Sequence, residues 1–197
     1  YTVILAIATV GIPSAMSKLV AEKVAIGNTK GAHKIYRTGL YLFSCIGLVC
    51  TLLMIVLAPA MARYVKNPGL EYSLWALAPS VLLVAISSVI RGYFQGYCNM
   101  RPQAVSQVID QVVKCIFTIL LAIAFVGRDA KIMAAAATLG ATIGTTVSMF
   151  YLIFYYGFKH KELKQLIAES ENDEVEERKE TIVRKIISLS IPISFGA

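Results

Sequence analysis

The stretch that decides the fold is residues 91–118, which read RGYFQGYCNMRP followed by QAVSQVIDQVVKCIFT. If the second part is one helix, at about 100° per residue, its polar side chains fall within an arc of roughly 100°. Apolar side chains cover the rest of that helix. A charged group at the middle of a bilayer costs at least about 2.5 kcal/mol, so the polar stripe is predicted to face other helices or a water-filled cavity. The stripe consists of Gln103, Gln107, Asp110, Gln111, Lys114 and Thr118.

The composition of the chain is that of a membrane protein. Hydrophobic residues make up 57% of the 197 residues and charged residues only 16%, with a mean hydropathy of +0.66. A soluble domain is about 45–50% apolar and about 25% charged. The net charge of +7 comes mostly from short loops beside apolar stretches, where membrane orientation explains it. The sequence therefore predicts a membrane protein with no nucleic-acid partner.

Apolar stretches of spanning length recur along the chain. About twenty helical residues cross the hydrocarbon core of roughly 30 Å. The sequence therefore predicts an all-α fold, a polytopic membrane helix bundle. The five predicted helices cover residues 1–26, 39–60, 71–97, 102–126 and 132–157.

Two hydrophilic segments interrupt or follow these helices. Residues 27–38 contain Gly27, Asn28 and Gly31 and are predicted to form a basic loop, with room for an interfacial helical turn bearing Lys34 and Arg37. Residues 158–182 hold eight of the twelve acidic residues, seven of them between Glu169 and Glu180, so they are predicted to form a charged linker with a helical start. Residues 183–197 begin a further apolar helix, and we expect the sequence to be an internal part of a longer protein.

The loops predict the orientation. Loops on one side carry fourteen of the nineteen Lys and Arg residues, and loops on the other side carry four. The positive-inside rule places the richer side in the cytoplasm. Residue 1 is therefore predicted on the extracellular side, and Arg91 and the linker 158–182 on the cytoplasmic side.

Two further helices carry polar faces. Lys18 and Glu22 are four residues apart near the end of the first span, and Arg91 and Gln95 are four apart in the third. Lys18 and Glu22 fit either a snorkelling Lys with a local ion pair or the lining of a cavity mouth. Arg91 fits either an interfacial anchor or a binding group. In the fifth span, the spacing Gly140-x-x-x-Gly144 predicts close packing of two helices.

Residues 91–114 resemble the segment joining the fourth and fifth helices of the polysaccharide-biosynthesis flippases. The resemblance is to the branch of stage V sporulation protein B and the peptidoglycan-precursor (lipid II) flippases, within the multidrug, oligosaccharidyl-lipid and polysaccharide exporter superfamily. Residues 11–15 (GIPSA) and 18–22 (KLVAE) are similar to the second helix of that branch. The resemblance implies two six-helix lobes around a central cavity. The fragment then covers about helices 2–7, with the acidic stretch between the lobes and Ser190–Ser194 opening the second lobe.

The resemblance implies a transporter that moves a lipid-linked oligosaccharide or peptidoglycan precursor across the bacterial cytoplasmic membrane by alternating access. On this hypothesis Arg91 and Lys18 capture the phosphate, with Glu22 beside them at the cavity mouth. Gln95, Gln107 and Gln111 contact sugar hydroxyls.

The pair Asp110 and Lys114, four residues apart, keeps both charges tolerable when the cavity is empty. The alternative for these two residues is a structural pair that locks helix packing.

Other functions remain open at this point. One is a multidrug and toxin extruder of the same fold, coupled to H⁺ or Na⁺; another is a membrane protein that does not transport, such as a receptor or scaffold. A drug-binding lobe is expected to offer acidic and aromatic groups to a cation, whereas this stripe mixes amides with both charges. The sequence shows no nucleophile–base pair, metal cluster or phosphate-binding glycine loop, so no enzyme and no cofactor are predicted. H⁺ or Na⁺ is the candidate coupling ion, and a monomeric transporter is expected.

Overall fold

The computed structural model describes residues 12–65, 69–125, 127, 129–169 and 179–195. Within these residues all regular structure is helical, which confirms the predicted all-α class. The helices are α2 (Ile12–Ala25), α3 (Thr29–Tyr64), α4 (Leu70–Gly96), α5 (Arg101–Ala124), α6 (Ala130–Glu169) and α7 (Lys179–Phe195).

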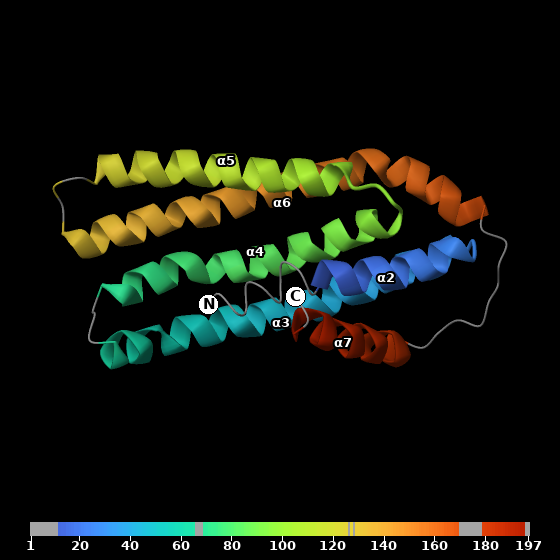
Figure 1. The fold of residues 1–197 in the computed structure, drawn as a ribbon, viewed down its shortest axis with the longest axis horizontal. Coiled ribbons are helices and arrows are strands. Elements are labelled where there is room, and N and C mark those ends of the chain that lie inside the picture. The colour runs from blue at the N-terminus through green and yellow to red at the C-terminus, as the bar shows by residue number, and fades with distance from the viewer. Residues whose placement is uncertain (1–11, 66–68, 126, 128, 170–178, 196–197) are drawn as a thin grey trace.

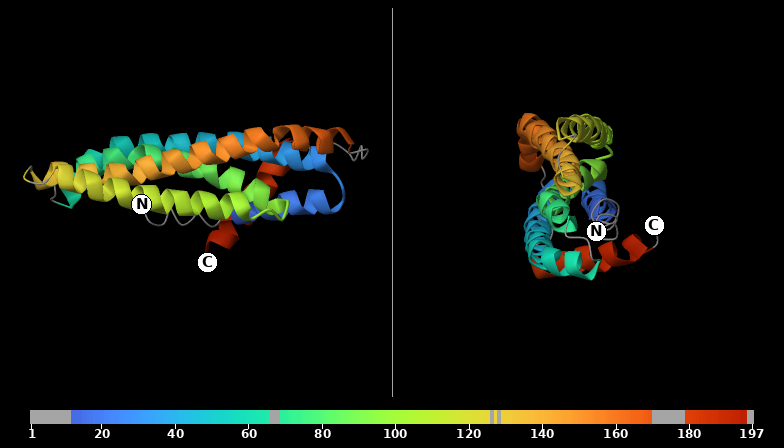
Figure 2. Two further views of the ribbon diagram at one scale, coloured as in Figure 1. Left: turned by 90° about the horizontal axis from the view of Figure 1, so that it is seen from above. Right: turned by 90° about the vertical axis from the view of Figure 1, so that its left-hand side faces the viewer.

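The long helices lie roughly side by side, and α4 is at the centre of the bundle (Figure 1). It packs against α3 on one side, α6 on another and α2 on a third. Helix α5 packs along α6 and touches α4 at only a few residues. Seen end-on, α5, α6, α4 and α3 follow one another round an arc, and α7 lies across α2 and α3 (Figure 2). The polar stripe therefore lies on a helix at the end of the arc.

Four described helices have the length and composition to cross a membrane: α3, α4, α5 and residues Ile132–Lys159 of α6. They correspond to the last four of the five predicted spans. The first predicted span, 1–26, overlaps α2, but residues 1–11 lie outside the described residues. The chain is thus a multi-pass membrane protein.

The predicted loop 27–38 is wrong, because α3 already begins at Thr29. The side chain of Asn28 caps this helix, since its Oδ1 accepts a hydrogen bond from the backbone N–H of Gly31 at 2.6 Å. Gly31 lies inside the helix, and a Cβ at this position would be 2.8 Å from Asn28 Oδ1. Asn28 and Gly31, which suggested a loop, are the residues that start the helix.

Helix α6 also exceeds its predicted end at 157. It continues to Glu169 and contains 40 residues, which corresponds to about 60 Å. The added segment is rich in Lys, Glu, Leu and Gln, which favour helices. The predicted linker 158–182 is therefore helical at its start and, from Lys179, at its end, where α7 begins. The remainder, residues 170–178, lies outside the described residues.

Threonine hydroxyls fix α4 to its neighbours next to a proline. Pro79 has no N–H and disturbs the hydrogen bonds of the helical turn before it. Thr142 of α6 donates to the carbonyl of Ala76 at 2.6 Å, and Thr51 of α3 donates to the carbonyl of Ala78 at 3.2 Å. In a membrane, such side chains both satisfy exposed carbonyls and join helices.

The predicted close packing at Gly140 and Gly144 is confirmed. A Cβ at Gly140 would be 2.5 Å from Thr118 Oγ1, and a Cβ at Gly144 would be 2.8 Å from the carbonyl oxygen of Asp110. The two glycines therefore let α6 approach the backbone of α5 along the polar stripe. A second pair, Gly92 and Gly96 on α4, plays the same part toward α2, which the sequence analysis missed.

Candidate functional site

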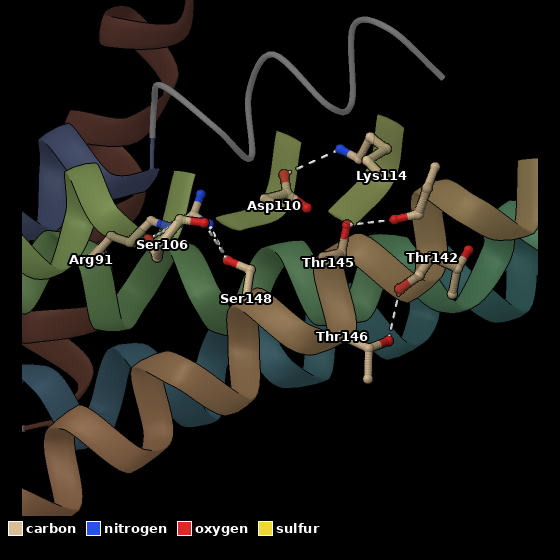
Figure 3. Close-up of polar contacts among 9 residues, drawn as sticks. Arg91, Ser106, Asp110, Lys114, Thr142, Thr145, Thr146 and Ser148 are labelled. Atoms are coloured by element: carbon tan, nitrogen blue, oxygen red, sulfur yellow. Dashed lines mark hydrogen bonds and ion pairs between the residues drawn. The ribbon is translucent and has the colours of Figure 1, made fainter. Parts of the chain in front are cut away.

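Arg91 joins three helices at a single buried point. Its side chain is 8% exposed. Its Nε donates to Ser106 Oγ of α5 at 3.0 Å, and its Nη2 donates to Ser148 Oγ of α6 at 2.9 Å (Figure 3). Ser148 Oγ in turn donates to the carbonyl oxygen of Ser106 at 2.9 Å. We call Arg91, Ser106 and Ser148 the arginine clasp.

The two serines of the clasp were not predicted from the sequence. Both are fully buried. Serine is common in apolar helices and often only fills space, so the residue type alone does not indicate a partner for Arg91. A signal was present for both. Ser148 follows Gly144 by four residues and so continues the row of small residues on α6. Ser106 precedes Asp110 by four residues on α5, which puts it one turn away on the same side of the helix.

The predicted pair between Asp110 and Lys114 is confirmed. Lys114 Nζ lies 3.1 Å from Asp110 Oδ2, with 32% of the Lys114 side chain and 16% of the Asp110 side chain exposed. Both residues lie beside Gly144 of α6, because a Cβ there would be 3.0 Å from Lys114 Cβ. The pair thus lies at the seam between α5 and α6 and remains partly open on one side.

The second carboxylate oxygen of Asp110 has an unusual environment. Asp110 Oδ1 is buried and has no hydrogen-bond partner among the described residues, and the same is true of Gln103 Oε1. A buried acceptor without a donor is costly. Asp110 therefore has one carboxylate oxygen paired with Lys114 and one without a hydrogen-bond donor among the described residues.

The other stripe residues of α5 differ in exposure. Gln107 and Gln111 are exposed, while Thr118 donates to the carbonyl of Ala137 on α6 at 3.2 Å. The stripe is therefore divided: Asp110, Lys114 and Thr118 face α6, and the two amides lie beside the seam. Exposed apolar side chains cover the other side of α5, as expected where a helix meets lipid; they are Val105, Val108, Val112, Ile116, Ile119, Leu120 and Ile123.

The structure brings together only some of the predicted site residues. Arg91 is linked to α5 by Ser106, one turn before Asp110. Gln95 is half-buried one turn after Arg91 on α4. Lys18 and Glu22 are exposed on α2, and Glu22 lines a small hollow at the junction with α3 and α7. These two residues therefore lie in a different part of the bundle from the Asp110–Lys114 pair.

The charges along this side of α5 alternate. The Arg91 cation lies at Ser106, the Asp110 anion one turn further, and the Lys114 cation one turn beyond that. Asp110 is the only acidic residue between positions 72 and 128. The row therefore carries one net positive charge, with exposed amides beside it. Such a set can bind an anion and hydrogen-bond a hydroxylated group.

Comparisons with known proteins agree with the resemblance of residues 91–114. Residues 1–196 match the model of a family described as polysaccharide biosynthesis protein. Stage V sporulation protein B of Bacillus subtilis (strain 168) is 39% identical over 130 residues, which are 66% of this chain and 25% of that protein. The lipid II flippase MurJ of the same organism is 34% identical over 126 residues, which are 59% of this chain and 23% of that protein.

The fold is also found in a solved transporter. An inward-facing multidrug resistance MATE family transporter of the MOP superfamily superposes with a TM-score of 0.79 at 13% sequence identity. The match covers 98% of this chain and 42% of that one. The chain thus spans about a quarter of the length of the two Bacillus relatives and less than half of the solved transporter. At this identity the solved structure shows the shared fold alone.

Proposed function

This chain belongs to the polysaccharide biosynthesis protein family, and from that premise we propose that the whole protein is a flippase that moves a lipid-linked saccharide across the bacterial cytoplasmic membrane. The observation that carries the proposal is the partly open row of Asp110, Lys114 and the exposed amides on a membrane-spanning helix. A purely structural helix has no need of two exposed glutamines and a partly exposed Lys within a membrane-spanning segment. The names of the relatives, a lipid II flippase among them, favour a transporter over an enzyme.

The proposed substrate needs the groups that this row offers. A lipid-linked saccharide has a phosphate or diphosphate and a sugar head rich in hydroxyls. Without replacement hydrogen bonds, moving that head through hydrocarbon would cost several kcal/mol for each polar group, on the order of 2–7. In our proposal Lys114 contacts the phosphate, and Gln107 and Gln111 contact the hydroxyls.

The other predicted residues take supporting parts. Lys18, exposed on α2, makes the first contact with the phosphate, with Glu22 beside it. Gln95 contacts sugar hydroxyls next to the clasp. The family resemblance predicts that Arg91 binds phosphate directly. Because Arg91 is buried and bound to two serines, in our proposal it instead positions α5 and acts on the substrate through Asp110.

Transport follows the alternating-access scheme of a two-lobe exporter. In this proposal α2 to α6 belong to the first lobe, and α7, which lies against α2 and α3, is the first helix of the second lobe. Rocking of the lobes would open the row first to the cytoplasm and then to the outside. H⁺ or Na⁺ is the coupling ion in this proposal, and the transporter acts as a monomer.

The alternative, a multidrug extruder, has less support from the site. An organic cation needs an uncompensated acid or an aromatic face. Here the one acid of the row is bound by Lys114 at 3.1 Å. If the extruder hypothesis is right, deletion of the gene will make its host more sensitive to cationic drugs, whereas the flippase hypothesis predicts unchanged drug sensitivity.

Complementation tests the proposed function. The full-length gene is expressed in a strain depleted of its lipid II flippase, and growth and cell shape are followed. The proposal predicts rescue by the wild-type gene and loss of rescue with Lys114→Gln at equal protein level in the membrane. Val112→Ala, a change on the apolar side of the same helix, is the matched control and should rescue. If the wild-type protein fails to rescue, transport of purified lipid-linked saccharides is measured in proteoliposomes. Transport of another saccharide would mean that lipid II is not the substrate, and no transport would contradict the proposed activity.

A further inference from the structure

The row on α5 contains more charge than a binding site for one phosphate needs. A phosphate requires cations, yet the most accessible cation, Lys114, is already paired with Asp110 at 3.1 Å. The pair is not sealed, because Lys114 is 32% exposed and Asp110 is 16% exposed. Any anion that reaches Lys114 therefore competes with the Asp110 carboxylate.

Asp110 has a second cation nearby. Ser106 lies one helical turn before Asp110 on the same side of α5, and Ser106 holds the Nε of Arg91 at 3.0 Å. One turn in the other direction lies Lys114. Asp110 is therefore flanked by a cation on each side, and its buried Oδ1 has no hydrogen-bond partner among the described residues.

The backbone around this carboxylate is held in place. Gly144 brings α6 so close that a Cβ would be 2.8 Å from the Asp110 carbonyl oxygen and 3.0 Å from the Lys114 backbone nitrogen. The clasp fixes Arg91 through two hydroxyls. The long Lys114 side chain is the member of the row that has both freedom and exposure, so it is the one that can turn toward a ligand.

We propose that Asp110 is an internal counter-anion, which the phosphate of the substrate displaces from Lys114 while Arg91 keeps the Asp110 charge compensated. This rests on the proposed function and adds a residue that sets affinity and release. When the phosphate is bound, Lys114 pairs with the phosphate and Arg91 compensates the charge of Asp110. When the phosphate leaves, Lys114 pairs with Asp110 again. This competition prevents the phosphate from being held too tightly.

This exchange predicts opposite effects on binding and turnover. In Asp110→Asn, Lys114 has no competing anion, so the phosphate binds more tightly but is released more slowly. A partly exposed ion pair is weak, so the expected fall in Kd is about three- to fivefold, with a comparable fall in the transport rate at saturating substrate. In Lys114→Gln the cation is lost, and Kd rises by about tenfold or more.

The experiment uses the full-length protein in nanodiscs and a short-chain polyprenyl diphosphate disaccharide as the probe, with binding followed by calorimetry. Polyprenol disaccharide, which lacks phosphate, and inorganic pyrophosphate are the comparison probes. The proposal predicts that Asp110→Asn lowers the Kd of the lipid-linked diphosphate and leaves the Kd of the uncharged probe unchanged. When Lys114→Gln is also present, Asp110→Asn has no effect on either Kd. Tightening of inorganic pyrophosphate to the same extent would identify phosphate alone as the recognised group, which also supports the exchange.

Controls separate the possible failures. Asp110→Glu keeps the charge and should retain the wild-type Kd; Asp110→Ser replaces Asp110→Asn if the latter does not fold. An unchanged or weakened Kd in the folded Asp110 variant overturns the counter-anion. If the wild-type protein itself neither binds the probe nor moves it in proteoliposomes, the proposed function fails instead.

Discussion

Two donors of the Arg91 guanidinium are taken by serines from different helices, so one side chain ties α4, α5 and α6 together. We predict that Ser148→Ala lowers the free energy of unfolding by about 1 kcal/mol, the size of a hydrogen bond between membrane helices. Arg91→Lys should cost more, because a single ammonium does not reproduce the fork that spans two hydroxyls. Thermal unfolding of the purified protein measures both.

A double-mutant cycle with Arg91→Met and Ser148→Ala then tests the clasp itself. Because the two side chains are in contact, we expect a coupling energy of about 1 kcal/mol. Additive effects would contradict the clasp.

Exchanging the charges of the ion pair separates structure from function at Asp110 and Lys114. The variant Asp110→Lys/Lys114→Asp keeps an oppositely charged pair with four-residue spacing but puts a cation at position 110 near Arg91, so we expect its unfolding temperature to fall modestly while the protein still folds. Transport should fall at least about tenfold, because the cation has moved one turn along α5. Transport assays in proteoliposomes provide the measurement, and full activity in the exchanged protein would make the pair purely structural.

At the scale of single residues, side chains that the helical period places on one face could be predicted, whereas contacts between residues far apart in the sequence could not. Gln107, Asp110 and Lys114 could be predicted because polar residues that recur every three or four positions stand out in an otherwise apolar helix. The partners of Arg91 lie 15 and 57 residues away, and serine carries no charge to mark it. Which serines meet Arg91 is decided by how α6 lies on α5, which only tertiary packing determines.

Among the helices, α5 and α6 pack against each other most extensively, and Gly144 lies at their seam. We predict that Gly144→Ala destabilises the protein by about 1–3 kcal/mol, because its Cβ meets backbone atoms of α5 that cannot move aside. Gly157→Ala on the same helix is the control. It has open space around it, and should be neutral or stabilise by up to about 1 kcal/mol. Equal unfolding temperatures for the two variants would argue against this packing.

The ends of the helices were harder to predict than their centres. Residues 39–60 and 132–157 were recognised because apolar runs of spanning length have few alternatives. The polar extensions, from Thr29 in α3 and up to Glu169 in α6, have no apolar signal. They are helical because Asn28 caps one helix and because helix-favouring residues continue the other past the membrane.

For the whole molecule, the orientation remains a prediction from the basic loops. Cys98 is exposed in the turn between α4 and α5, which is predicted to be cytoplasmic. With every other cysteine of the protein replaced by serine, a membrane-impermeant maleimide should label Cys98 only after the cells are opened. Asp129→Cys with Cys98→Ser, at an exposed position in the turn between α5 and α6, should be labelled in intact cells. The reverse labelling pattern would show that the orientation is opposite to the predicted one.

The central claim is that the polar side of α5 faces a water-filled path used by the substrate, and thiol accessibility tests it most directly. In a cysteine-free full-length protein, Gln107→Cys and Gln111→Cys are compared with Val108→Cys and Val112→Cys on the apolar side. We predict rapid maleimide labelling at 107 and 111 in membranes, slowed by a polyprenyl diphosphate disaccharide, and little labelling at 108 and 112. Equal labelling at all four positions, or none at 107 and 111, would contradict the account.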